Sequence, residues 1–139
     1  MTNNKHEQHC KSIADRLNAI ADGRLYKCPE CGEYVEDNRL FCECGCQVDL
    51  IGTDDSYGWE MVTFYDYFEN ALDIDYITNS RKEYKACRIM IAFGGPNIYV
   101  NTWESKVELY WWNESASYYL DSGTRDAIDE WAEEYFNCL

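Results

Sequence analysis

The stretch KACRIMIAFGGPNIYVNTWESKVELYWW, residues 85–112, decides the fold of this chain. Along 84–93, large apolar residues alternate with others, and a period of two predicts a half-buried β-strand. A turn signal follows at Gly94 to Asn97, and residues 98–103 and 106–112 predict two further strands joined through Glu104 and Ser105. We therefore expect a three-stranded antiparallel meander.

Helical patterns flank this meander. Apolar residues recur every three or four positions along 5–22, and Gly23 follows as a C-terminal stop. A last helix is expected over about 124–137. A further helix is expected over 59–72, because one face would collect Trp59, Val62, Tyr65, Phe68 and Leu72.

Five of the eight cysteines fall within 19 residues, in KCPECG at 27–32 and FCECGC at 41–46. No export signal precedes them, so metal ligation is favoured over disulfides. Two thiolates separated by two residues, Cys28 and Cys31, can face one ion. A segment with so few aliphatic residues also needs a metal to hold its shape.

Residues 26–48 resemble the zinc-ribbon family, with a CPxCG knuckle followed by a second cysteine-rich turn. The resemblance implies a structural Zn²⁺ held by four cysteines. Gly45 follows Cys44 as Gly32 follows Cys31, which makes Cys44 the third ligand by analogy. The fourth ligand is Cys42 or Cys46, because the spacing of the second turn is irregular.

The expected fold class is thus α+β: an N-terminal helix, a small zinc ribbon, a helix, the three-stranded meander and a C-terminal helix. The expected organisation is an N-terminal helix over 1–25, the ribbon over 26–48 and an α+β domain over 57–139. The N-terminus lacks the apolar core of a secretory signal. A cytoplasmic location, in a bacterial host cell, is the expectation.

The charge of the chain limits its partners. Its 139 residues include 26 Asp and Glu against 12 Lys and Arg, a net charge of −14. Such a surface repels phosphate and attracts basic proteins, so direct nucleic-acid binding and a membrane partner are not expected. Residues 40–80 contain nine acids and no Lys or Arg, and in 107–139 the acids are opposed only by Arg125.

Two sets of residues are candidates for contact with a basic partner. Acids three or four positions apart on a helix lie about 5 to 6 Å apart, comparable to neighbouring phosphates on a strand. Two expected helices carry such acids: Asp66, Glu69 and Asp73 on the first, and Asp126, Asp129, Glu130, Glu133 and Glu134 on the second. The other set lies on the sheet face turned away from the helices and contains the interface-type aromatics Trp103, Tyr110 and Trp112.

An enzymatic function is not expected. Glu104-Ser-Lys106 matches the short E-x-K pattern of restriction-type nucleases, with Asp75 as an upstream carboxylate. Such a site would hold Mg²⁺ through two carboxylates. The pattern is short enough to occur often by chance, and it falls at an expected hairpin turn. No catalytic residue is therefore assigned.

The segment from GGPNIY at 94–99 to YWW at 110–112 resembles an uncharacterised acidic family carried on phages and mobile elements, over about residues 86–138. In general character the chain is similar to the anti-CRISPR and anti-restriction proteins of such elements. This resemblance implies an inhibitor that occupies the basic nucleic-acid-binding surface of a CRISPR effector or restriction enzyme. The alternative is a zinc-ribbon adaptor that binds a protein complex such as the transcription machinery.

Overall fold

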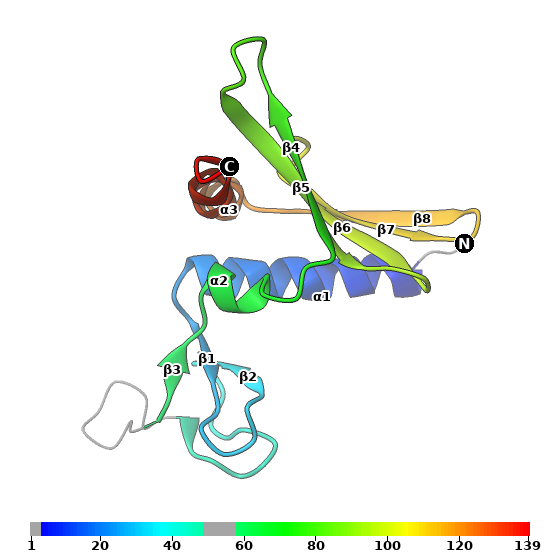
Figure 1. The fold of residues 1–139 in the computed structure, drawn as a ribbon. Coiled ribbons are helices and arrows are strands. Elements are labelled where there is room, and N and C mark those ends of the chain that lie inside the picture. The colour runs from blue at the N-terminus through cyan, green and yellow to red at the C-terminus, as the bar shows by residue number, and fades with distance from the viewer. Residues whose placement is uncertain (1–3, 49–57) are drawn as a thin grey trace.

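Five antiparallel strands form the main sheet, in the same order in space as along the chain (Figure 1). The structure is a computed structural model that describes residues 4–48 and 58–139. The strands are β4 (Asp73–Thr78), β5 (Tyr84–Ala92), β6 (Asn97–Asn101), β7 (Lys106–Trp111) and β8 (Glu114–Tyr119). The expected meander is confirmed as β5, β6 and β7, and one further strand extends it at each edge.

Two helices, α1 (Asn4–Ala21) and α3 (Ser122–Phe136), pack against this sheet. The inward residues of β5, β6 and β7 are the alternating apolar ones, and they share one buried core with both helices. Leu17 of α1 and Ile128 of α3 are fully buried in that core beside Ile89, Val100 and Leu109. The two terminal helices expected from periodicity are therefore confirmed.

The opposite face of the sheet holds a polar cluster around Glu108, which is buried. Its carboxylate accepts hydrogen bonds from Arg88 at 3.0 Å, from Asn101 at 3.3 Å and from the Tyr110 hydroxyl at 2.9 Å. The Arg88 guanidinium also lies 3.7 Å from the centre of the Tyr99 ring. Burial opposes ionisation of Glu108, but these hydrogen bonds outweigh it and lower its pKa below the usual range.

The expected helix over 59–72 is wrong. The described part of that segment contains a two-residue strand, β3 (Glu60–Met61), and one helical turn, α2 (Phe64–Tyr67). Thr63 starts α2 with a capping box to Asp66, and the chain enters the sheet where the Leu72 amide donates to Met90. Phe64 and Phe68 are the residues that α2 buries, rather than a stripe with a period of three or four.

The cysteine-rich segment forms a separate lobe beside α1 and α2 (Figure 1). Its sheet pairs β1 (Leu25–Lys27) with β2 (Tyr34–Glu36) on one side and with β3 on the other. Residues 49–57, which include the expected start of the third segment at 57, lie outside the described residues. Among the described helices, none combines the length and the apolar character that a membrane crossing requires.

Candidate metal centre and partner-binding surface

Two turns of the small lobe bring four cysteines together. In the first, Gly32 donates its amide to the Cys28 carbonyl at 3.0 Å and adopts a φ of +76°, which glycine tolerates without strain. In the second, Gly45 donates to the Cys42 carbonyl at 2.9 Å and adopts a φ of +101°. Each turn presents its cysteines to the other.

The sulfur atoms of Cys28, Cys31, Cys42 and Cys44 all lie within 4.8 Å of one another. The Cys28–Cys44 separation is 3.5 Å and the Cys31–Cys42 separation is 3.3 Å. Zinc binds thiolate sulfur at about 2.3 Å in a tetrahedron, whose edges are then about 3.8 Å. The group therefore fits a tetrahedral ion bound by four thiolates, and Zn²⁺ is the ion that such a donor set prefers.

Cys46 lies outside this group of four. Its sulfur is 3.6 Å from that of Cys44, whereas Cys42 is almost fully buried among the other ligands and beside Val35 and Val48. The geometry therefore favours Cys42 as the fourth ligand. The spacing of the cysteines left this choice open, because it depends on how the second turn folds.

One thiol of the group ionises easily. Burial opposes the ionisation of Cys28, but backbone hydrogen bonds at Cys31 and Glu30 and the nearby Cys44 outweigh it, and the pKa falls to about 6. Cys28 can thus offer a thiolate at neutral pH. A bound ion would supply the charge that stabilises the remaining thiolates.

The acids on the outer side of α3 form a continuous row in this protein. Asp126, Glu130 and Glu133 are exposed, and the single cation close to them in the chain, Arg125, forms an ion pair with Asp126 at 3.0 Å. Tyrosine hydroxyls hold two more of the acids: Tyr84 donates to Asp129 at 2.6 Å and Tyr65 donates to Glu134. Burial and the bond to Asp129 raise the pKa of Tyr84, so it remains a donor at neutral pH.

The first expected row, Asp66, Glu69 and Asp73, does not lie on one helix. Asp66 is in α2, Glu69 follows it, and Asp73 begins β4. A pocket of about 450 Å³ nevertheless brings Asp66 and Glu69 beside α3, where Trp131 and Tyr135 line it. The structure thus places part of this row beside the Trp131 and Tyr135 side of α3, which is turned away from Asp126, Glu130 and Glu133.

The three aromatic candidates do not share one surface: Tyr110 and Trp112 line the same hollow at one end of the sheet, whereas Trp103 lies beside α3. Trp103 is exposed and lines a hollow with Asp126 and Asp129 of α3. Tyr110 is on the outward sheet face, where it is bonded to Glu108. Trp112 is 87% exposed at the β7–β8 turn. These aromatics do not form one patch, so we do not treat them as a single surface.

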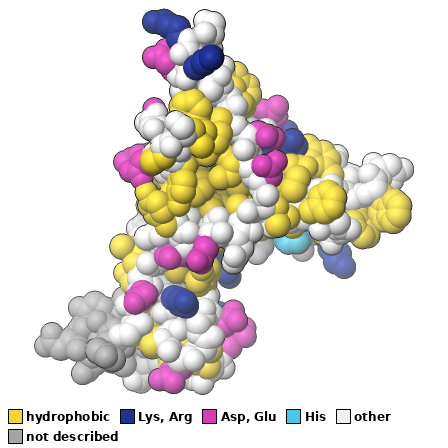
Figure 2. All heavy atoms as spheres, in the orientation of Figure 1, with side chains coloured by type: hydrophobic (Ala, Val, Ile, Leu, Met, Phe, Trp, Pro, Cys, Tyr) yellow, Lys and Arg dark blue, Asp and Glu magenta, His cyan; other side chains and the backbone are white. Residues whose placement is uncertain are grey.

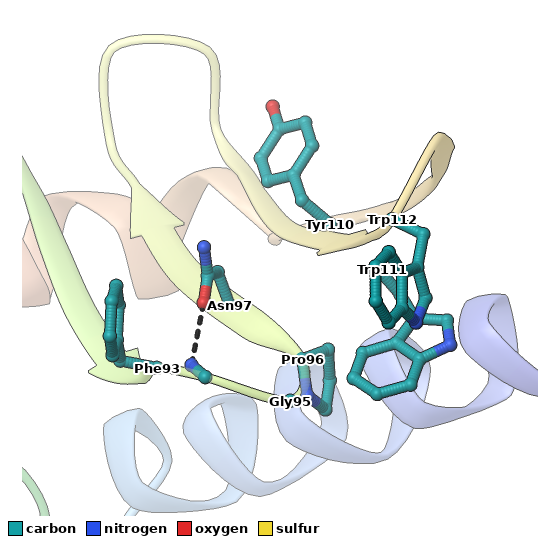
Figure 3. A pocket seen from close by; sticks show the side chains of 8 residues that line it. Phe93, Gly95, Pro96, Asn97, Tyr110, Trp111 and Trp112 are labelled. Atoms are coloured by element: carbon teal, nitrogen blue, oxygen red, sulfur yellow. Dashed lines mark hydrogen bonds between the residues drawn. The ribbon is translucent and has the colours of Figure 1, made fainter.

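Trp112 borders a hollow of about 280 Å³ at the far end of the sheet (Figure 3). Its other walls come from Phe93, Tyr110, Trp111 and the Gly94–Asn97 turn. The Asn97 side chain accepts a hydrogen bond from the Gly94 amide at 2.8 Å and so closes this turn. The lining of this hollow contains no acidic or basic side chain, whereas the pocket beside α3 contains Asp66 and Glu69.

The residues of the E-x-K pattern do not gather into the metal site that a restriction-type nuclease would need. Lys106 forms an ion pair with Glu104 at 2.8 Å and approaches Glu108 at 3.8 Å. Asp75 lies in β4, opposite Arg88 of β5 in the strand register. Two strands, β5 and β6, therefore separate Asp75 from Lys106 in β7. With strands about 4.8 Å apart, this gap is too wide for one ion to bridge.

No family model, no curated protein and no solved structure matches this chain. The relation to proteins of phages and mobile elements stays a prediction. The fold and the cysteine cluster are the observations from which a function is proposed.

Proposed function

We propose that the protein is an acidic inhibitor of a nucleic-acid-targeting bacterial defence enzyme, a CRISPR effector or a restriction enzyme. It acts by occupying the basic surface with which that enzyme holds nucleic acid. The observation that carries the proposal is the row of carboxylates on the outer side of α3. Asp66 and Glu69 lie at a pocket on another side of the same helix.

The row is suited to replace phosphates because its charges are held in place. Asp129 and Glu134 are fixed by tyrosine hydroxyls, so less side-chain entropy is lost when a basic surface binds them. Successive carboxylates on one helix side lie about 5 to 6 Å apart, close to the spacing of phosphates along a strand. A groove that binds a phosphate backbone would meet a similar series of charges.

The cysteine lobe has a structural role in this proposal. Four thiolates would complete the coordination of zinc and leave no open position for catalysis.

The lobe also supports the second candidate function, an adaptor that binds a protein complex such as the transcription machinery, because it forms a separate body with its own small core. Capture of partners by the tagged protein, from a bacterial lysate that contains defence enzymes, distinguishes the inhibitor from the adaptor.

Capture of a CRISPR effector or restriction enzyme supports inhibition, whereas clean capture of RNA polymerase supports the adaptor.

Charge reversal then tests the contact. Lysines replace three exposed acids of the row in the test variant: Asp126, Glu130 and Glu133. In a matched control, lysines replace three exposed acids elsewhere: Asp37, Glu60 and Asp75. The test variant should lose capture of the enzyme and the control should retain it, whereas equal capture by both would refute the proposed surface.

A further inference from the structure

The pocket between α2 and α3 combines aromatic walls with carboxylates. It has a volume of about 450 Å³, and its principal lining residues are Tyr65, Asp66, Phe68, Glu69, Trp131 and Tyr135. The lining contains two acids and no Lys or Arg. Figure 2 shows hydrophobic side chains gathered over this part of the molecule, with acidic side chains at the border.

The aromatic rings of the pocket pack into one cluster. The Trp131 ring centre lies 4.9 Å from that of Phe68 and 5.1 Å from that of Tyr135, and Tyr65 meets both Trp131 and Tyr135. The Tyr65 hydroxyl is fixed to Glu134 of α3, which ties α2 to α3 across the pocket. The walls are therefore preformed rather than assembled on binding.

Two carboxylates at the rim are free to meet a cation. Asp66 uses one oxygen, Oδ2, to cap α2 through Thr63, which leaves its other oxygen without a partner in the described residues. The Glu69 side chain is exposed and forms no hydrogen bond or ion pair within the described ranges. Both carboxylates lie next to aromatic surface, and neither forms an ion pair within the described ranges.

Trp131 is the buried part of the pocket wall. It is 6% exposed, and its indole Nε1 is the one buried side-chain polar atom without a hydrogen-bond partner in the described part of the chain. This nitrogen has almost no accessible surface, so an occupant would contact the Trp131 ring rather than its N–H.

We propose that this pocket binds an arginine side chain presented by a basic protein partner. The inference rests on the proposed function, and it names the chemistry of one contact. A guanidinium stacks on aromatic faces and forms paired hydrogen bonds with carboxylates, so it uses both features of the lining at once. A lysine ammonium is a compact, strongly hydrated charge that matches the aromatic walls less well. A phosphate-bearing ligand would be repelled by Asp66 and Glu69.

The test uses the intact, metal-loaded protein and N-acetyl-L-argininamide as the probe. Binding is followed by NMR through backbone amides and the indole N–H of Trp131. We expect saturable shifts confined to α2 and the 131–135 part of α3. The neutral isostere N-acetyl-L-citrullinamide should cause little shift, and the lysine analogue should bind more weakly. Equal binding of the citrulline probe, stronger binding of the lysine probe, or shifts centred elsewhere would overturn the inference.

Two conservative variants locate the contact. Glu69→Gln removes one charge at the rim and leaves the helix cap intact. Tyr135→Leu replaces an aromatic ring of the wall by an aliphatic side chain. Each should weaken arginine binding by about twofold to fivefold, which corresponds to about 0.5 to 1 kcal/mol for a cation–π contact or ion pair at a partly exposed site. Asp75→Asn, on the outward sheet face, is the matched control and should bind as the unaltered protein does. If the two pocket variants bind as well as this control, the pocket is not the site.

The two proposals can fail separately. If the protein inhibits a defence enzyme while the pocket does not bind arginine, the arginine inference is wrong and the proposed function stands. If arginine binds in the pocket but no defence enzyme is captured or inhibited, the proposed function is wrong and the arginine site stands.

Discussion

Replacing Cys42 by serine should destroy the metal centre, whereas replacing Cys46 should not. The two cysteines belong to the same turn and were equivalent in the sequence. In the structure, the Cys42 sulfur lies 3.3 Å from that of Cys31 and belongs to the group of four. Cys46 lies 3.6 Å from Cys44 and also approaches Cys28, but it is not part of the group of four. The paired variants therefore test the geometry of the site directly.

The expected size of the effect follows from the energy of a structural zinc site. Zinc binding to small thiolate-containing domains contributes about 10 to 16 kcal/mol, which is about 3 to 4 kcal/mol for each of four ligands. Loss of one thiolate should therefore weaken the affinity for zinc by about 100-fold to 1000-fold. Cys46→Ser should change the affinity by less than about tenfold, because the four ligands remain.

The assay is competition for zinc between the reduced protein and a chromogenic chelator, with metal content measured after gel filtration. Cys42→Ser should lose zinc and order in the 26–48 lobe. The five-stranded domain should remain folded, because its core contains none of the four ligands. The reasoning would be refuted if Cys46→Ser lost the metal and Cys42→Ser kept it, or if the unaltered protein held well under one zinc per chain.

Three further predictions concern the sheet and its ends. Burial raises the pKa of Glu108, but the hydrogen bonds from Arg88, Tyr110 and Asn101 together outweigh it and hold the pKa below its usual range. The contribution of Glu108 to stability is therefore present above about pH 4.3 and is lost as the pH falls through the lowered value. Glu108→Gln should cost about 1 to 3 kcal/mol at pH 7 and flatten the loss of stability between pH 5 and 3, both measured by urea unfolding. A Cβ on Gly95 would lie 2.8 Å from the Trp111 ring, so Gly95→Ala should cost about 1 to 3 kcal/mol in the same assay; unchanged stability would contradict this packing. The protein with Mg²⁺ or Mn²⁺ should leave single- and double-stranded nucleic acid intact, and cleavage that disappears in Glu104→Ala would overturn the absence of catalysis.

The central strands were predictable because they are buried on one face. β5, β6 and β7 alternate apolar residues that fill the core, and this alternation is visible in the sequence. The edge strands carry a weaker signal: β4, DIDYIT, alternates over only four residues, and β8, ESASYY, has no large aliphatic residue. An edge strand is stabilised by hydrogen bonds to one neighbour, and the sequence does not show which neighbour that is.

The incorrect helix over 59–72 has an equally physical cause. Apolar residues every three or four positions favour a helix, but the backbone of this segment is used elsewhere. The Val62 amide donates to Leu25 of the small lobe, and the Leu72 amide donates to Met90 of the sheet. Between these two points there is room for one capped turn. Such long-range hydrogen bonds override local periodicity and cannot be derived from it.

The candidate metal ligands were predictable in type and number, but the identity of the fourth was not. The CPxCG knuckle gave Cys28 and Cys31 from spacing alone, and the second turn offered three cysteines for two places. The pocket beside α3 was not predictable, because it joins α2 (Phe64–Tyr67) to a helix that begins only at Ser122. The acids that line it were singled out, but for a helical arrangement that the protein does not have.

The central claim is that the acidic side of α3 occupies a basic nucleic-acid-binding surface. The most direct measurement is displacement of a fluorescent nucleic acid from purified CRISPR effectors and restriction enzymes, followed by anisotropy at two salt concentrations. The unaltered protein should displace the nucleic acid from its target, less effectively at higher salt, and the variant with lysine at Asp126, Glu130 and Glu133 should not. Displacement by both proteins alike, or by neither from any enzyme tested, would contradict the account.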